Sequence, residues 1–385
     1  MRTVAIATIS QYYLLSNYGS FFQHYALRKV LKGFGCRPFR VFSPEERRPL
    51  VQRISKCLVD FLRPLYWFLR RDSECRLKTE QMRLRNRAMS LFVRDYQGLI
   101  GQLYEKPLFD AETMGVRGGD QVFCRDTPQR WLCEVPTNNP LITYAASTDW
   151  MQLKAHTDWQ AVLAERLKRF TALGLRESEG VAFARGLAPV GSDVRQVADP
   201  VQLLTVSDFR DIQSRKSIFT RPTMFCYLVN IARREDLSLE KYERLAERMG
   251  CELKVVGIQG TERVLPSECR IVLSPSEFLR ALDDASTFIT NSYHGSVFAM
   301  TYHKNFLSIQ QNCPAGTDQN LRQKELMQSF GLANRWVDWR LGSEEMLESL
   351  STTIDWNSVD ERMSVRRKES LQWLGSVLGL VEERE

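Results

Sequence analysis

Histidine is scarce in this sequence, and long apolar runs are missing. Only four of the 385 residues are histidines, and two of them fall in "ITNSYHGSVFAMTYHKNFLSI", residues 289–309. No stretch reaches the roughly 18 uninterrupted apolar residues that a membrane-spanning helix needs, so we expect no such helix. The first residues, "MRTVAIATIS", lack the features of a signal peptide and are typical of a strand. A cytoplasmic location is therefore expected.

Paired cysteines are missing as well. The nine cysteines are scattered, and no CxxC pair occurs among them. An odd number without a framework predicts reduced thiols in the cytosol, and the spacings match no zinc site. We expect most of them to be small buried hydrophobic residues. The net charge of +7 is modest and suits an anionic substrate, a nucleic acid or a membrane surface.

The order of apolar segments predicts alternating strands and helices. Residues 4–9 indicate a buried strand, Gly19 to Leu31 a helix, and Cys36 to Phe42 a second strand. This is a βαβ opening, and the alternation resumes after Phe109. Further strands are expected at 121–124, 142–146, 172–175, 224–231, 252–258, 287–290 and 305–309, and helices at 151–169, 178–185, 239–249, 275–284 and 321–330.

The length of the chain predicts more than one domain, because 385 residues are too many for one compact core. We predict an α/β fold with two Rossmann-like domains that face a cleft, residues 1–204 and 205–340. A helical insertion at about 45–105 interrupts the first domain. Residues 341–385 should form helices that pack back across the domains, with Arg366–Lys368 on a solvated face. Ligands of such sheets bind at the carboxyl ends of the strands.

The insertion contains a basic and apolar segment, residues 47–71. Its cations face one acid, Asp60, and three aromatic residues, 66–68, stand beside arginines. This composition is typical of an amphipathic helix on an anionic membrane surface. It is equally typical of a helix with its apolar side toward the core, and Pro64 should kink or split it. Both interpretations remain open.

His294 stands where a strand turns into a helix. Ser292 is a suitable N-cap, and Gly295 lets a backbone or a ligand come close. Because a helix N-terminus favours an anion, His294 could bind a phosphate or transfer a proton. A core histidine with a satisfied hydrogen bond is the alternative, which this segment alone favours. His303 and Lys304 are expected at the surface or in a loop.

Polar residues also stand beside two other predicted strands. Arg176 ends a strand and can bind a carboxylate or phosphate through two hydrogen bonds, unless an ion pair with Glu177 or another acid occupies it. Residues 118–121, "GGDQ", begin another strand, where the glycines permit close backbone approach. Asp120 could act there as an acid, a base or a cap.

The first strand-to-helix loop supplies Asn17, Tyr18 and Gly19, and Gln23 follows one turn into the helix. Amide and phenol groups in such a loop suit sugar hydroxyls as readily as they suit helix capping.

Six short motifs follow one another in a fixed order along the chain. They are "NYGSFFQHYAL" (17–27), "GGDQVF" (118–123), "YAAS" (144–147), "RE" (176–177), "DPVQLL" (199–204) and "TNSYHGSVF" (290–298). This set resembles the polysaccharide pyruvyl transferase family over about residues 1–335, with 45–105 poorly matched. The last motif is the most specific. Gly119 stands where the family usually has serine, which would remove one hydroxyl contact.

The resemblance implies a fold like that of the two-domain glycosyltransferases called GT-B. It also implies transfer of pyruvate from phosphoenolpyruvate to a sugar of a bacterial capsule or exopolysaccharide, as a cyclic ketal across two hydroxyls of a hexose such as galactose. The residues that it implies for donor binding are Arg176, Ser292, His294, Gly295 and Arg322, with Lys304 and Lys324 as alternatives to Arg322.

We expect His294 to transfer the proton or stabilise the phosphate, and Asp120 to act as a base near the acceptor. The expected acceptor-binding residues are Asn17, Tyr18, Gly19, Gln23 and Gln121. No metal or other cofactor is expected, because two or three cations can balance the charge of the donor. The family's acceptors are often lipid-linked saccharides at the cytoplasmic membrane face, which favours the membrane interpretation of residues 47–71.

Two other functions remain open. A nucleotide-sugar-dependent glycosyltransferase of the same shape would bind a nucleoside diphosphate in the cleft and release no phosphate from phosphoenolpyruvate. A non-catalytic nucleic-acid-binding protein would use the basic segment, but no recognised nucleic-acid motif occurs and nucleic acid is not an expected partner. The sequence specifies neither the sugar nor the oligomeric state.

Overall fold

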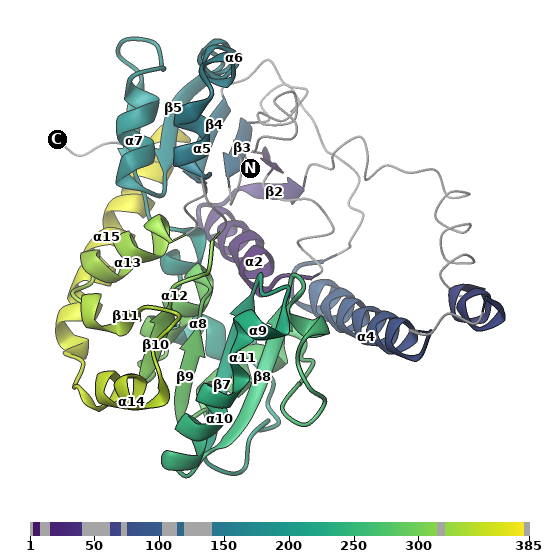
Figure 1. Ribbon diagram of the computed structural model, residues 1–385. Coiled ribbons are helices and arrows are strands. Elements are labelled where there is room, and N and C mark those ends of the chain that lie inside the picture. The colour runs from purple at the N-terminus through teal and green to yellow at the C-terminus, as the bar shows by residue number, and fades with distance from the viewer. Residues whose placement is uncertain are drawn as a thin grey trace.

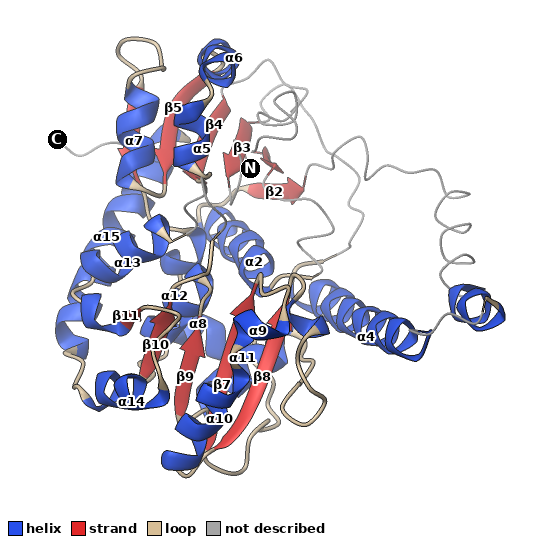
Figure 2. Cartoon of the chain, in the orientation of Figure 1, coloured by secondary structure: helices blue, strands red, loops and turns tan. Residues whose placement is uncertain are grey.

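Two parallel β-sheets with helices around them dominate the structure (Figure 1). The computed structural model describes residues 3–7, 16–40, 62–70, 75–101, 114–118, 141–313 and 320–380. Figure 2 shows the strands of the two sheets in red, one sheet above the other, with the blue helices packed about them. The arrangement confirms the predicted α/β class with two domains.

The first sheet has six strands in the order β2-β1-β3-β4-β5-β6, and every neighbouring pair is parallel. Its strands are β1 (Thr3–Ala7), β2 (Arg37–Arg40), β3 (Met114–Gly118), β4 (Leu141–Ala146), β5 (Phe170–Leu175) and β6 (Asp193–Gln196). The order reverses at β1, because β2 lies on one side of it and β3 on the other. Ligands of doubly wound sheets bind in the crevice at such a reversal.

Three local features differ from the sequence analysis. Gly118 ends β3 rather than beginning a strand, and the strand expected at 121–124 lies outside the described residues. The edge strand β6, "DVRQ", has one buried residue and no apolar run, so no strand was predicted for it. The single helix expected over 151–169 is two helices, α5 (Trp150–Ala155) and α6 (Thr157–Leu167), which meet at His156.

The second sheet has five parallel strands in the order β11-β10-β9-β7-β8. They are β7 (Thr223–Val229), β8 (Glu252–Ile258), β9 (Thr287–Thr290), β10 (Phe306–Ile309) and β11 (Trp336–Val337). Here the order reverses between β7 and β9. The residues that follow these two strands, Asn230 and Asn291, therefore flank the expected ligand crevice.

Helix α2 (Tyr18–Gly33) belongs to the first βαβ unit but packs against the second domain. The ring of Phe22 lies 6.0 Å from that of Phe209 and 5.1 Å from that of Phe298, measured between centroids. Tyr18 stacks on Phe278 with 4.3 Å between centroids. One apolar core thus joins α2 to the second domain and fixes the N-terminus of α2 beside the second sheet, while the first sheet has separate cores.

The remaining helices connect and cover the sheets. The chain crosses between the domains through the short helices η2 (Pro200–Leu203) and α8 (Val206–Arg210). The last helix, α15 (Trp356–Val377), returns to the first domain, where the Trp373 indole N–H donates to Asp193 Oδ2 at 2.6 Å. The other helices are α4 (Cys75–Leu99), α7 (Ser178–Arg185), α9 (Arg234–Leu237), α10 (Leu239–Arg248), η3 (Thr261–Arg263), α11 (Pro275–Asp284), α12 (Tyr293–Thr301), α13 (Leu321–Ser329), η4 (Ala333–Arg335) and α14 (Ser343–Ser351).

Within the described part of the chain, no helix combines the length and the hydropathy that crossing a membrane requires.

Candidate active site

The N-terminus of α12 presents His294 to the first domain. Ser292 is the N-cap and accepts a hydrogen bond from the Gly295 N–H at 3.4 Å, as its position in the sequence predicts. Thr290 holds the preceding turn, because its hydroxyl donates to the Tyr227 carbonyl and accepts from the Ser292 N–H. A Cβ at Gly295 would stand 2.2 Å from Thr290 Oγ1. This position therefore requires glycine for close packing.

Asp199 is the residue on which the candidate site converges. Its Oδ2 accepts a hydrogen bond from Gln23 Nε2 at 2.6 Å and from Arg176 Nη1 at 3.1 Å. The same oxygen lies 3.4 Å from His294 Nε2. Asp199 is fully buried, and Gln23 and His294 are almost so. Three predicted site residues from both domains thus meet at one carboxylate that was not predicted.

Arg176 follows β5 and is held by its own domain. Its Nε donates to Glu177 at 2.8 Å, and its Nη2 donates to the Ser147 hydroxyl at 2.6 Å. The guanidinium carbon stands 4.2 Å from the centroid of the Tyr293 ring of α12, a cation–π contact between the domains. The ion pair with Glu177 that the sequence left open is therefore present. We call Gln23, Ser147, Arg176, Glu177, Asp199 and His294 the Asp199 cluster.

The Asp199 cluster contains two carboxylates and one guanidinium, all buried. Burial alone would raise the pKa of the Asp199 carboxyl, but His294, Arg176 and the Val201 N–H outweigh it and hold that pKa below its usual value. The carboxylate is therefore ionised near neutral pH. It can orient the imidazole of His294 and balance a positive charge on that ring.

The N-terminus of α2 closes over the Asp199 cluster. A Cβ at Gly19 would stand 2.2 Å from His294 Nδ1, so only glycine lets the imidazole lie against this helix. Tyr18 is buried, and its hydroxyl donates to the Leu273 carbonyl of the second domain at 2.7 Å. Asn17 is the N-cap of α2, through a bond from the Ser20 N–H. Of the predicted acceptor residues, Gly19 and Gln23 thus contact the Asp199 cluster, whereas Asn17 caps α2 and Tyr18 bonds the second domain.

The C-terminal helix supplies arginines beside the cluster, which corrects the solvated face expected for this part of α15. Arg366 Nη2 donates to the carbonyl of Arg176 at 3.3 Å. Arg367 donates to the carbonyls of Gln202 and Leu204, and its burial lowers its pKa. Backbone carbonyls near the domain connection need donors, and α15 provides them. The mixed charges in the sequence of the tail did not predict that Arg366 and Arg367 contact the backbone of the first domain.

Of the other predicted basic residues, Arg322 and Lys324 lie on α13, and Lys304 lies between α12 and β10. Arg322 is its second residue and is half-buried, and its role as a donor ligand stays a prediction. Lys324 stands 5.8 Å from the centroid of the Trp336 ring, and Lys304 donates to the Asp283 carbonyl at 2.9 Å. The same helix reaches the first domain, since Glu325 accepts from the Ser178 N–H at 2.9 Å.

Two predicted residues, Asp120 and Gln121, lie outside the described residues. They follow β3 by two and three positions along the chain.

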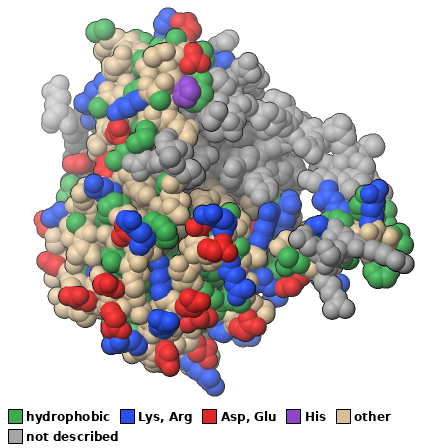
Figure 3. Space-filling view, in the orientation of Figure 1, with side chains coloured by type: hydrophobic (Ala, Val, Ile, Leu, Met, Phe, Trp, Pro, Cys, Tyr) green, Lys and Arg blue, Asp and Glu red, His purple; other side chains and the backbone are tan. Residues whose placement is uncertain are grey.

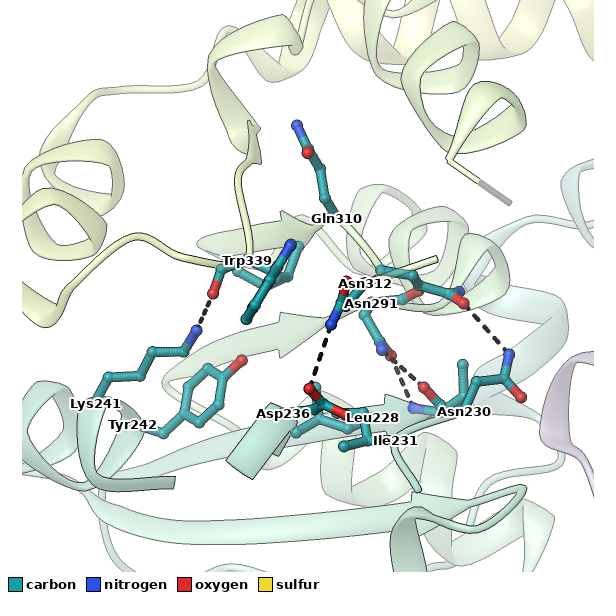
Figure 4. A pocket seen from close by; sticks show the side chains of 13 residues that line it. Leu228, Asn230, Ile231, Asp236, Lys241, Tyr242, Asn291, Gln310, Asn312 and Trp339 are labelled. Carbon is teal, nitrogen blue, oxygen red and sulfur yellow. Dashed lines mark hydrogen bonds between the residues drawn. The ribbon is translucent and has the colours of Figure 1, made fainter. Parts of the chain in front are cut away.

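A second candidate site opens at the reversal of strand order in the second sheet. We call it the amide pocket, and the polar residues of its wall include Asn230, Tyr242, Asn291, Gln311, Asn312 and Trp339 (Figure 4). Its cavity volume is about 40 Å³, which holds a few water molecules. The amides bond mainly among themselves and to the backbone. Asn291, for example, exchanges two hydrogen bonds of 2.8 Å with the peptide of Val229.

The charged groups in the wall of the amide pocket are paired. Asp236 accepts from Asn312 Nδ2 at 3.3 Å and binds Arg233. Lys241 donates to the Trp339 carbonyl, and burial lowers its pKa. The Tyr242 hydroxyl faces the pocket, with no hydrogen bond to any other described residue. The pocket thus offers neutral groups and aromatic rings, next to the segment that leads to His294.

Comparison with known proteins identifies the family of the chain. A model of the family described as polysaccharide pyruvyl transferase matches residues 17–312, which is most of the chain. No curated protein matches the sequence.

Solved structures match the fold along the whole chain. MnaA of S. aureus, solved with UDP, has a TM-score of 0.54 at 9% identity, and the match covers 100% of this chain and 99% of that one. A UDP-N-acetylglucosamine 2-epimerase from Rickettsia bellii has a TM-score of 0.49 at 10% identity, over 98% and 97%. MurG of Acinetobacter baumannii has 0.42 at 10%, over 99% and 100%. The match with MnaA, which has a TM-score above 0.5, confirms the GT-B-like fold predicted from the sequence.

Proposed function

The chain belongs to the polysaccharide pyruvyl transferase family, and on that basis we propose that it transfers pyruvate from phosphoenolpyruvate to two hydroxyls of a sugar. The product is a cyclic ketal, on a hexose such as galactose. The observation that supports this proposal most is the Asp199 cluster, which brings His294 and Arg176 together from two domains. Phosphoenolpyruvate carries a carboxylate and a phosphate, and an arginine and a histidine suit these groups.

The proposed reaction begins with a proton. His294 gives its proton to the methylene carbon of phosphoenolpyruvate, and positive charge develops on the carbon that carries the phosphate. A sugar hydroxyl adds to this carbon and loses its proton to a base, for which we propose Asp120. The bond between this carbon and the phosphate oxygen then breaks, and phosphate leaves with the proton that Asp120 took up. A second hydroxyl closes the ketal and returns a proton to His294.

Asp199 has a defined part in this proposal. Its oxygen lies 3.4 Å from His294 Nε2 and balances the positive charge that the ring carries before it gives up its proton. Arg176 and Arg322 are proposed to bind the anionic groups of the donor, assisted by the N-terminus of α12. Because Arg176, Asp199 and His294 are all buried, the donor would enter when the two domains separate.

The proposed acceptor is a lipid-linked saccharide of capsule or exopolysaccharide synthesis, met at the cytoplasmic face of the membrane. Asn17, Gln23 and Gln121 are the proposed contacts for its hydroxyls, with Tyr18 and Gly19 shaping the wall. The side-chain oxygen of Gln23 is buried and has no hydrogen-bond partner among the described residues. A buried amide oxygen that lacks a donor is a suitable acceptor for a sugar hydroxyl.

Phosphate release from phosphoenolpyruvate tests the proposal. The wild type is assayed with a panel of lipid-linked and synthetic galactosides and glucosides, beside His294→Ala. The matched control is His303→Ala, since His303 is part-exposed and pairs with Asp360 at 2.8 Å. We expect release that depends on the acceptor in the wild type and the control, and a loss of about 100-fold or more in His294→Ala.

Two results would count against the proposal. Near-wild-type turnover by His294→Ala would remove this residue from the mechanism. If the wild type neither releases phosphate nor binds phosphoenolpyruvate in an equilibrium assay, pyruvyl transfer is not its reaction. The alternative, a nucleotide-sugar-dependent glycosyltransferase, then predicts binding of a nucleoside diphosphate sugar by the same protein.

A further inference from the structure

Exposed apolar side chains gather on one helix outside both domains. Of the ten large apolar side chains that are exposed among the described residues, six lie between residues 62 and 77. Residues 62–69 form a helix of two turns. Its exposed members are Leu62, Leu65, Tyr66, Phe68 and Leu69, whose exposed fractions run from 51% to 71%. Such a cluster marks a surface that another body covers.

The order of these residues makes the helix amphipathic. Leu62, Leu65, Tyr66 and Leu69 follow the spacing i, i+3, i+4, i+7, so they share one face. Arg63 and Arg70 are seven residues apart and lie together at the edge of that face. The guanidinium of Arg70 stands 5.3 Å from the centroid of the Tyr66 ring. The apolar face is thus bordered by positive charge, and it does not contact the core.

Helix α4 links this part of the chain to the body of the protein. Its second half is anchored, since Phe92 and Tyr96 are buried in the core that joins the domains, and Asp95 accepts from the Ser276 N–H at 2.7 Å. No described side chain of residues 75–91 is buried. Figure 1 shows α4 projecting from the sheets, with the helix of residues 62–69 beyond its N-terminal end.

The charge of this projection is positive overall, although residues 71–74, which join its two helices along the chain, include Asp72 and Glu74 beside Arg71. We call residues 62–70 and 75–91 the basic arm. Its cations are Arg63, Arg70, Arg76, Lys78, Arg83, Arg85 and Arg87, and its one acid is Glu80, which contacts Arg270 of the second domain. Figure 3 shows basic and hydrophobic side chains together on the projection at the right. A surface of this composition attracts an anionic partner that also accepts apolar groups.

We infer that the basic arm docks the protein on an anionic lipid bilayer, with the apolar face of residues 62–69 in the interfacial region. A bilayer offers negative charge and hydrocarbon at one surface, and an aromatic residue such as Tyr66 suits its interface. A second copy of the chain is a poorer occupant. A twofold contact would place this face against itself and bring the same arginines together.

A membrane surface at residues 47–71 is one interpretation of the sequence, and the exposed apolar face lies at residues 62–69 within that segment. Docking there does not depend on the proposed reaction. Residues 62–69 expose their apolar side chains, so they do not face the core. A lipid-linked acceptor would be met at the same surface, but the docking needs neither phosphoenolpyruvate nor a sugar. Binding to vesicles is therefore measured without substrates, and its failure is distinguishable from a failure of the reaction.

The test is co-sedimentation of the full chain with vesicles of phosphatidylcholine alone or with added phosphatidylglycerol. We expect binding to the anionic vesicles that weakens with salt. Leu65→Asp/Leu69→Asp should weaken it at least about tenfold, because two side chains of the apolar face are lost from the interface. Arg83→Gln/Arg87→Gln, which changes two exposed residues, should weaken it about thirtyfold.

The matched control is Met151→Asp/Val190→Asp, which adds the same charge at two exposed apolar residues outside the arm. It should bind as the wild type does. All variants change exposed side chains, and unchanged thermal unfolding would verify that they fold. The inference is overturned if the wild type does not bind anionic vesicles, or if Leu65→Asp/Leu69→Asp binds as well as the control. It is also overturned if the wild type is a dimer that this variant converts to a monomer, because the face then belongs to a second copy.

Discussion

The Asp199 cluster and the amide pocket lie beyond the carboxyl ends of parallel strands, yet they are built from opposite chemistry. The cluster is charged, buried and assembled from both domains. The amide pocket is lined by the second domain alone, mostly by neutral groups, and its charges are paired locally. A buried charge needs partners that water cannot replace, whereas neutral groups at an open pocket can exchange theirs with water.

The difference predicts where the protein depends on a single side chain. In the cluster, Gln23, Arg176 and His294 all contact the same carboxylate oxygen of Asp199, so the loss of any member affects the others. In the pocket, Asn291 pairs with one nearby peptide. Substitutions that remove similar groups should therefore lower the free energy of unfolding more in the Asp199 cluster than in the amide pocket.

The largest effect is expected from Arg176→Met. It leaves the buried carboxylates of Glu177 and Asp199 without their guanidinium, which costs about 3–5 kcal/mol of the free energy of unfolding. The matched control is Lys154→Met, because Lys154 pairs with Glu179 at 2.6 Å on the surface of the same domain. That pair should contribute no more than about 1 kcal/mol. Urea unfolding measures both, and equal costs would contradict the view that the cluster depends on its charges.

A smaller effect is expected from Gly19→Ala. The new Cβ meets the imidazole of His294 at 2.2 Å, so the ring or helix α2 must move, at a cost of about 1–3 kcal/mol. Turnover should fall as well, since His294 leaves its place beside Asp199. Gly33→Ala is the control in the same helix, because a Cβ there meets nothing within 4 Å. That substitution should be neutral or stabilise by up to about 1 kcal/mol. A Gly19→Ala protein as stable and active as Gly33→Ala would mean that the close approach is unimportant.

The smallest effect is expected in the amide pocket. Tyr242→Phe removes a hydroxyl that has no hydrogen bond to any described residue, so stability should change by less than about 0.5 kcal/mol. Tyr18→Phe removes the hydroxyl that binds the Leu273 carbonyl between the domains. It leaves that buried carbonyl without its donor and should cost about 1–2 kcal/mol. Thermal unfolding of the two variants compares the regions directly. A larger loss for Tyr242→Phe would reverse the comparison.

Much of the fold is predictable because its signals are local. Helix α11 was predicted with the bounds that it has, Pro275–Asp284. Proline at its first turn and the capping box of Ser274 and Glu277 define where it begins. Strand β9 was likewise predicted as it stands, because its four residues are all buried and precede a cap. Edge strand β6 has no such signal, since one of its faces is in water.

The candidate site is predictable only in part, because its geometry depends on distant contacts. Asp199 also has a local role, since it caps η2 by accepting from the Val201 N–H at 2.9 Å. This capping role is by itself a sufficient reason for an aspartate at position 199. No neighbouring residue in the sequence indicates that Arg176 and His294 converge on Asp199. Tyr18 looks like a loop residue beside a site, yet its hydroxyl bonds a carbonyl 255 positions away. Such pairings follow from how the domains pack.

The position of helix α2 has a consequence for folding during synthesis on the ribosome. Phe22 and Gly19 leave the ribosome early, but their partners Phe298 and His294 are synthesised some 275 residues later. Synthesis proceeds at about 5–20 residues per second. The apolar side of α2 therefore remains without its packing partners for tens of seconds. Trp373, which fills the space beside Gly174 in the first domain, arrives later still. The core of the first domain is thus complete only when the chain is almost finished.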